Sequence, residues 1–144
     1  MQKIYLDNNA TTRVDPMAVE EMLPLFREQF GNPSSIHSFG NKVGAKLKVA
    51  RQQVADLIGA LHETEVIFTS CATESTSTAI LSALKVQPDK KEIITTLVEH
   101  PATLELCEQL EREGYKIHWL KVDSKGRLDL NEYKLSIYKI ELKI

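Results

Sequence analysis

The chain has 144 residues, of which 42% are hydrophobic and 26% charged, a composition typical of globular proteins with an apolar core. The net charge of −2 gives no electrostatic basis for binding nucleic acid or an anionic membrane. No apolar run approaches the roughly 20 residues of a membrane helix, and the first residues lack the apolar core of a signal peptide. The two cysteines, Cys71 and Cys107, have no metal-ligand spacing, so free thiols in a cytoplasmic protein are expected.

The first sixty residues predict a short strand and two helices. Residues 4–6 begin as an apolar strand that runs into a polar turn. Asp15 and Pro16 then have the types preferred at a helix cap and a first helical position, although Pro24 lies inside the predicted helix. One face of this helix is apolar, with Val19, Met22, Leu23 and Phe26.

A loop of Gly, Asn, Pro and Ser residues covers 30–41 by composition. It is followed by a helix over 42–58, and Gly59 is expected to end that helix.

From residue 65 onward the pattern alternates between strands and helices. Strands are predicted at 65–69, within 92–100 and at 115–122, with helices at 72–86 and 101–113. This alternation predicts an α/β fold with a mostly parallel sheet, flanking helices and right-handed crossovers.

The end of the sequence is less regular. Residues 123–126 predict a turn, and Asp129 is expected to cap one last short helix. Three strands with two or three helices cover a parallel sheet poorly, so the domain is expected to be incomplete at Ile144.

Residues 69–76, TSCATEST, form a small, hydroxyl-rich turn between the first strand of the alternation and its helix. The first N–H groups of a helix lack partners within the helix and lie at the positive end of its dipole. Small residues there let an anion reach the backbone, which suggests a phosphate site at the carboxyl end of a strand. The alternative is simple capping of the helix by Ser70. Neither a Walker pattern nor G-x-G-x-x-G is present, which argues against nucleoside triphosphates and dinucleotides.

His100 lies just beyond the second predicted strand, at the same functional edge of the sheet. A histidine there could stack on an aromatic ring or transfer a proton. The alternative is a loop histidine bonded to the backbone.

Five motifs together resemble the N-terminal part of cysteine desulfurases, most closely the nitrogen-fixation type. In sequence order they are LDNNATT (6–12), FGNPSSIHSFG (30–40), EVIFTSCATES (65–75), VEHPA (98–102) and GRLDL (126–130). Cysteine desulfurases are pyridoxal-phosphate enzymes of the class-V aminotransferase group. The resemblance therefore implies the N-terminal part of the large domain of an aminotransferase-like fold, called fold type I.

The resemblance also implies roles for particular residues. Ala72 and Thr73 match the pair that binds the cofactor phosphate, and His100 matches the histidine that stacks over the cofactor ring and takes part in proton transfer. The segment 8–11 matches a loop on the substrate side. His37 lies in a motif near the site and the dimer interface, where a structural role is expected for it.

Other groups that the resemblance requires are missing from this sequence. The family's lysine that forms a Schiff base with the cofactor, the carboxylate beside the ring nitrogen and the cysteine that carries the persulfide match no motif here. The thirteen lysines are interpreted as solvated charges. Cys71 and Cys107 are both interpreted as packing residues.

These observations predict a division into residues 1–133, the N-terminal part of a desulfurase large domain, and 134–144, a divergent tail. In the parent family, L-cysteine is converted to L-alanine and the sulfur passes through an enzyme persulfide to an iron–sulfur scaffold protein, with the enzyme a homodimer. The chain alone is expected to be inactive. The alternative is a non-catalytic module that binds phosphate, pyridoxal phosphate or a desulfurase subunit.

Overall fold

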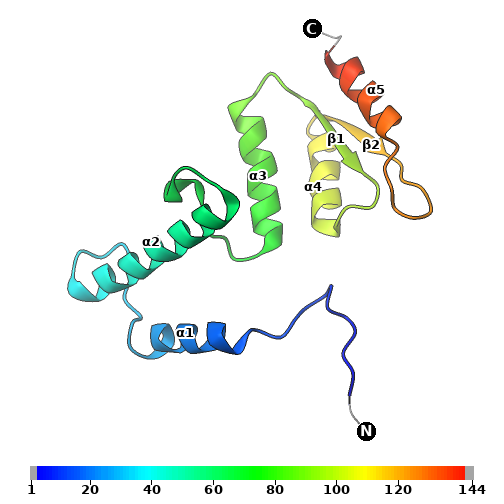
Figure 1. Ribbon diagram of the computed structural model, residues 1–144. Helices are drawn as coiled ribbons and strands as arrows, with labels where there is room; N and C mark the ends of the chain where they lie inside the picture. Colours follow the sequence, from blue (N-terminus) through cyan, green and yellow to red (C-terminus); the bar gives the residue numbers. More distant parts are fainter. Residues whose placement is uncertain (1–2, 142–144) are drawn as a thin grey trace. The chain divides into compact units, whose positions relative to one another are not determined.

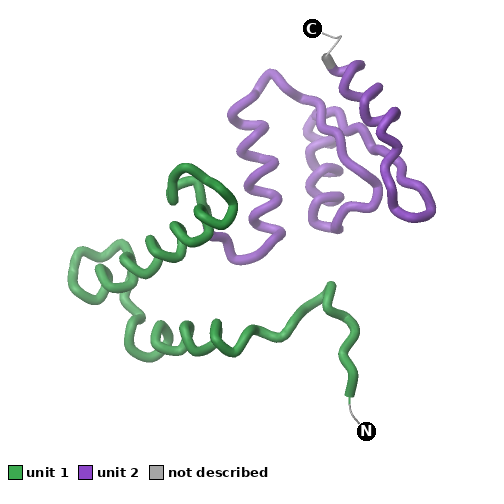
Figure 2. The backbone as a smooth tube through the Cα atoms, in the orientation of Figure 1, with its two compact units in different colours: residues 1–67 green, residues 68–144 purple. Residues whose placement is uncertain are grey.

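The structure is a computed structural model that describes residues 3–141. The chain divides into two compact units, Met1–Ile67 and Phe68–Ile144 (Figure 2). Each unit is considered by itself. No helix among the described residues combines the length and apolar character needed to cross a membrane.

In its described residues, 3–67, the first unit contains two α-helices, α1 (Pro16–Arg27) and α2 (Ser38–Ile58), and a 3-10 turn, η1 (Glu63–Glu65). The predicted cap of α1 is confirmed, because the Asp15 carboxylate accepts a hydrogen bond from the Met17 amide at 2.8 Å. Helix α1 continues through Pro24 and ends at Arg27.

Helix α2 begins four residues before the predicted start at residue 42. His37 is its N-cap, and the ring Nδ1 accepts a hydrogen bond from the Gly40 amide at 3.4 Å. Gly40 lies so close to the preceding loop that an added Cβ would sit 2.5 Å from the Asn32 carbonyl oxygen. The lack of a side chain at Gly40 thus lets the loop fold back on the first turn of α2. Gly59 ends the helix with φ of 73°, as predicted.

The second unit is a small α/β structure. Its elements are α3 (Ala72–Val86), β1 (Glu92–Thr96), α4 (Pro101–Arg112), β2 (Lys116–Leu120) and α5 (Leu130–Glu141) (Figure 1). Strands β1 and β2 pair in parallel, in a register that places Ile93 opposite Ile117. The parallel strand pair and the flanking helices confirm the predicted α/β class.

The core of the second unit lies between α4 and the sheet. Cys107 and Leu110 of α4 and Ile117 of β2 are buried together, and Ile80 and Leu84 of α3 pack against them. The predicted packing role of Cys107 is therefore confirmed. Because side chains of α3 and α4 contact the same core residues, the two helices lie on the same side of the sheet.

Two predicted strands do not form. Residues 4–6 and 66–69 are not in strands, and residues 63–65 form η1 instead of starting a strand. A strand requires backbone hydrogen bonds to a neighbour, and within residues 3–141 the sheet contains β1 and β2. Strand β1 forms within the predicted segment 92–100, and β2 is shorter than the predicted 115–122 at both ends.

The last helix, α5, is capped as predicted by Asp129, whose carboxylate accepts a hydrogen bond from the Asn131 amide at 2.8 Å. Twelve residues long, α5 runs past residue 133. The division at residue 133 between a desulfurase-like part and a tail stays a prediction.

Candidate functional site

The predicted phosphate-binding pair lies at the start of α3. Ala72 and Thr73 are the first two residues of the helix, and Cys71 is its N-cap. The Ser75 amide donates to the Cys71 carbonyl at 3.1 Å, so the amides of residues 72–74 precede the first hydrogen bond of the helical ladder. The predicted alternative, a cap provided by Ser70, is wrong, because the side chain and amide of Ser70 are turned toward Glu74 instead.

Glu74 ties the turn to the helix. Its carboxylate oxygen Oε2 accepts hydrogen bonds from the Ser70 amide at 2.7 Å and from the Ser70 hydroxyl at 2.6 Å. Both bonds lower the pKa of Glu74, and the bond from the Ser70 hydroxyl has the larger effect. A second link joins the Thr69 and Ser75 hydroxyls at 2.5 Å. The turn is thus held by side chains on both sides of Cys71.

Sequence reasoning did not predict this network. A signal for it was present, since a glutamate three residues after the N-cap is the spacing of a capping box. The Glu74 side chain bonds to Ser70 and not to the N-cap, Cys71. Which of the two it reaches depends on its rotamer.

The thiol of Cys71 is exposed, so its interpretation as a packing residue is wrong. Its pKa is lowered, chiefly by the Glu74 amide, and further by the Ser70 hydroxyl and the Thr73 amide. The sulfur therefore shares backbone donors that an anion at this helix end would use. The buried thiol of Cys107 behaves in the opposite way, because burial raises its pKa.

His100 is the N-cap of α4, and Pro101 is the first residue of that helix. Its ring is exposed, and Nδ1 accepts a hydrogen bond from the Ala102 amide at 3.2 Å. This bond assigns the proton of the neutral ring to Nε2. The side chain thus has a structural role as a cap while Nε2 remains the atom that carries a transferable proton.

The two sequence-predicted features lie at one end of the second unit. Helices α3 and α4 pack against each other, and both begin at the end of the unit at which β1 finishes (Figure 1). Ala72, Thr73 and His100 are therefore on the same edge of the sheet, the carboxyl edge. Their contacts with a cofactor remain a prediction.

The other residues singled out by the sequence lie in the first unit. Residues 8–10 form a turn closed by a hydrogen bond of 3.1 Å from the Ala10 amide to the Asp7 carbonyl. His37 caps α2, which is consistent with the structural role expected for it.

The residues at the start of α3 fit a phosphate group by their donors. Three backbone amides at the positive end of a helix and the small side chain of Ala72 leave the backbone accessible to an anion. The negative charge of Glu74 is directed back to Ser70 by two hydrogen bonds. The chemistry of this donor set therefore suits a phosphate, with the Cys71 sulfur as a competitor for the same amides.

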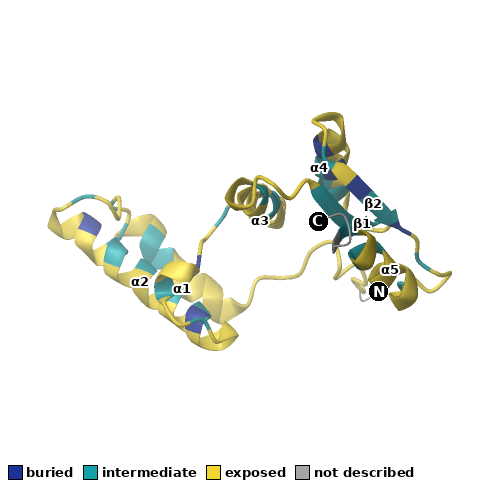
Figure 3. Cartoon of the chain, turned by 90° about the horizontal axis from the view of Figure 1, so that it is seen from above, coloured by how far each residue is buried: buried dark blue, intermediate teal, exposed yellow. Residues whose placement is uncertain are grey.

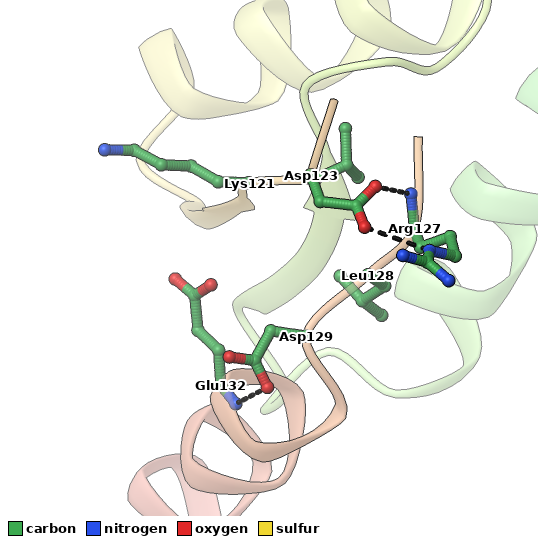
Figure 4. A pocket seen from close by; sticks show the side chains of 7 residues that line it. Lys121, Asp123, Arg127, Leu128, Asp129 and Glu132 are labelled. Atoms are coloured by element: carbon green, nitrogen blue, oxygen red, sulfur yellow. Dashed lines mark hydrogen bonds and ion pairs between the residues drawn. The ribbon is translucent and has the colours of Figure 1, made fainter. Parts of the chain in front are cut away.

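A hollow in the second unit lies elsewhere, in the turn between β2 and α5 (Figure 4). Its lining consists mainly of charged residues, among them Lys121, Asp123 and Arg127. The Asp123 carboxylate already accepts hydrogen bonds from the Lys125 amide at 2.8 Å and the Arg127 amide at 2.9 Å. The hollow is the inside of a tightly bonded turn, and none of the predicted site residues lines it.

Comparison with known proteins identifies the group to which these features belong. Residues 4–140 match the family of class-V aminotransferases. The chain belongs to this family. The resemblance to cysteine desulfurases is also confirmed, because the chain is 66% identical to the cysteine desulfurase NifS of Azotobacter vinelandii over 133 residues, which are 92% of this chain and 33% of that protein.

Solved structures also agree with the fold. A NifS-like protein matches with a TM-score of 0.85 and 41% identity over 91% of this chain and 36% of its own. A structure of SspA in complex with cysteine matches with a TM-score of 0.73 and 35% identity over 80% of this chain and 33% of its own. The chain thus spans about one third of the length of the relatives that it matches.

Proposed function

We propose that this chain is the cofactor-phosphate-binding part of a cysteine desulfurase and does not catalyse the reaction by itself. The family uses pyridoxal phosphate. When bound, this cofactor acts as an electron sink for the bonds of the amino acid that is attached to it. The observation that supports the proposal is the placement of Ala72, Thr73 and His100 at one edge of the sheet, in a chain 66% identical to a cysteine desulfurase.

In this proposal the residues of the chain have separate tasks. The amides at Ala72 and Thr73 bind the phosphate, and the Thr73 hydroxyl adds a donor. His100 would lie beside the cofactor ring and hold a transferable proton at Nε2 while Nδ1 stays bonded to the Ala102 amide. Glu74 keeps the turn in shape through Ser70.

The reaction of the complete enzyme is proposed from the relatives. It converts L-cysteine to L-alanine, and the sulfur leaves on an enzyme cysteine for an iron–sulfur scaffold protein that serves nitrogen fixation. Homodimer formation and a cytoplasmic location are part of the same proposal. Cys71 is not assigned the persulfide role, because its sulfur lies at the phosphate end of the site.

Binding of phosphate-bearing and phosphate-free ligands tests the proposal. The purified chain is titrated with pyridoxal phosphate, pyridoxal and inorganic phosphate, with amide NMR shifts of residues 72–74 as the readout. Pyridoxal phosphate and phosphate are expected to shift these amides, and pyridoxal is not. Thr73→Ala is expected to weaken binding about tenfold, the scale of one charge-assisted hydrogen bond. Thr78→Ala, at an exposed position of α3 five residues later, is the matched control.

Two further measurements address catalysis. With L-cysteine, pyridoxal phosphate and a reductant, the chain is expected to release no more sulfide than pyridoxal phosphate alone. Borohydride reduces a Schiff base to a stable adduct. This treatment is expected to trap no cofactor at any single, specific lysine of the chain. Equal binding of pyridoxal and pyridoxal phosphate, or a single trapped lysine, would contradict the proposal.

A further inference from the structure

The turn between β1 and α4 leads directly into His100. Strand β1 is half-buried along its length (Figure 3), and His100 begins α4 as its N-cap. Residues 97–99 connect Thr96, the last residue of the strand, to His100. Two of these residues are exposed, whereas the third, Glu99, is half-buried. A carboxylate loses hydration when it is partly buried, so it needs a hydrogen-bond partner within the protein.

The partner of Glu99 is the hydroxyl group of Thr96. This hydroxyl donates a hydrogen bond to Glu99 Oε1 at 2.9 Å and accepts one from the Val98 amide at 3.4 Å. A threonine hydroxyl has one donor and two acceptor positions, so both contacts can be made at the same time. The Leu97 amide donates to the Leu120 carbonyl, at the end of β2, at 3.1 Å. Each residue of the turn is therefore held by a hydrogen bond, and Thr96 provides two of these bonds.

The charge of Glu99 acts on the core side of α4. Burial raises the pKa of Cys107, and the negative charge of Glu99 raises it further. Cys107 belongs to the core of the second unit, so the carboxylate lies close enough to this side of the helix to affect a buried thiol. A negative charge at the start of α4 is also favourable, because the N-terminal end of a helix carries a partial positive charge.

His100 depends on the same turn for its own contacts. Its ring is exposed, and Nδ1 accepts the hydrogen bond from the Ala102 amide. Its carbonyl oxygen accepts hydrogen bonds from the amides of Thr103 at 2.8 Å and Leu104 at 3.2 Å. These contacts require the chain to enter α4 in one direction, and the preceding turn sets that direction.

We propose that Thr96 and Glu99 are positioning residues for His100. Their hydrogen bond fixes the turn so that Nδ1 of His100 caps α4 and Nε2 carries the proton. Neither Thr96 nor Glu99 is assigned a contact with substrate or cofactor. The value of this positioning for catalysis rests on the function proposed above for His100, whereas the positioning itself is measured without cofactor.

The experiment is amide hydrogen exchange of the full 144-residue chain. The Ala102 amide reports its bond to His100, and the Leu110 amide of the same helix reports the stability of the unit. Thr96→Val and Glu99→Ala are each expected to speed exchange at Ala102 about tenfold relative to Leu110, the scale of one hydrogen bond. Both variants break the same bond, so the double variant is expected to stay near tenfold and not to reach about a hundredfold.

A second measurement reports the ring of His100 directly. The imidazole nitrogen NMR shifts of the neutral ring distinguish the two tautomers. The unchanged chain is expected to show the tautomer with the proton on Nε2, and Thr96→Val is expected to show a mixture of both. Thr96→Ser retains the hydroxyl group and is expected to restore the Ala102 exchange rate and the single tautomer. Thr95→Val makes the same replacement one residue earlier, on the other face of β1, and is the matched control.

Three outcomes would overturn the inference. Equal acceleration at Ala102 and Leu110 would show that Thr96 and Glu99 only stabilise the unit. Additive effects in the double variant would show that the two residues act separately. An unchanged tautomer of His100 in Thr96→Val would show that the ring does not depend on the turn.

A milder variant covers the case in which the others do not fold. Glu99→Gln keeps the length of the side chain and an oxygen acceptor but removes the charge. It is expected to speed exchange at Ala102 about threefold, because a neutral hydrogen bond is about half as strong as a charge-assisted one. A failure of the proposed function is distinguishable from these results. In that case the amides of residues 72–74 do not respond to pyridoxal phosphate, whereas the results at Ala102 are obtained without it.

Discussion

His118 on β2 and Glu92 on β1 are joined by a hydrogen bond of 2.6 Å between Nε2 and Oε2. The two side chains are only 16% and 22% exposed. The same carboxylate oxygen lies 3.3 Å from the Lys116 ammonium group, and Lys116 is the register partner of Glu92. One carboxylate on β1 is therefore bonded to two residues of β2 on a single face of the sheet.

This relationship predicts the effect of removing the carboxylate. Glu92→Ala is expected to lower the free energy of unfolding by about 1–3 kcal/mol, because it leaves a mostly buried His118 nitrogen without this acceptor. Urea unfolding followed by circular dichroism measures the change. Glu108→Ala, on an exposed position of α4, is the control, and its expected change is within about 0.5 kcal/mol. Equal changes in the two variants would refute the role assigned to Glu92.

The two cysteines predict a difference in reactivity. Hydrogen bonds from the Glu74 amide lower the pKa of Cys71, whereas burial raises the pKa of Cys107. A larger fraction of Cys71 is therefore thiolate at pH 7, and this sulfur is exposed. Iodoacetamide at pH 7 is expected to label Cys71 more than tenfold faster than Cys107, as measured by peptide mass spectrometry.

Two controls test whether the folded structure causes this difference. In concentrated urea the two rates should become similar. Ser70→Ala removes a hydroxyl that lowers the pKa of Cys71 and is expected to move the pH midpoint of labelling upward. An unchanged midpoint would mean that Ser70 does not stabilise the thiolate.

Gly40 predicts a steric effect at the start of α2. An added methyl group would lie 2.5 Å from the Asn32 carbonyl oxygen, and backbone atoms cannot yield as a flexible side chain does. Gly40→Ala is expected to destabilise the first unit by about 1–3 kcal/mol. Gly44→Ala is the matched control, since its nearest neighbour is at 3.3 Å and alanine favours the helix. Thermal unfolding of both variants tests this, and the prediction fails if Gly44→Ala is the less stable protein.

Asp123 predicts a dependence of stability on pH. The Arg127 amide, and then the Lys125 amide, lower the pKa of its carboxyl group in the folded chain. The unfolded carboxyl group binds a proton more readily, so this stabilisation is present above the ordinary pKa of about 4 and is lost as pH falls through the lower folded value. Asp123→Asn should therefore reduce the difference in urea midpoint between pH 7 and pH 3. An identical difference in the two proteins would show that the turn does not depend on the charge.

The features predicted correctly from the sequence are those determined by a few neighbouring residues. The caps at Asp15 and Asp129 and the helix end at Gly59 depend on local side chains and local backbone angles. The strand pair β1–β2 was also predictable, because α4 connects the strands directly. The start of α2 was misplaced because Gly40 and its neighbours have loop-like composition, although their close packing suits the first turn of a helix.

The errors concern features that depend on distant residues or on side-chain conformation. Segments 4–6 and 66–69 have the composition of strands, yet a strand needs a neighbour that composition cannot supply. At the candidate site, the positions of Ala72 and Thr73 at a helix start followed from the pattern of the sequence. The bonds from Ser70 to Glu74 did not, because they depend on the rotamers of both side chains.

The short connection between the paired strands has a consequence for biosynthesis. Strand β1, helix α4 and strand β2 lie within residues 92–120, so nearly all of their contacts are between residues that leave the ribosome within seconds of each other. The apolar segments around Leu6 and Ile67 emerge earlier, but within residues 3–141 neither segment pairs with a strand. During translation they are the segments that a chaperone would have the longest time to bind.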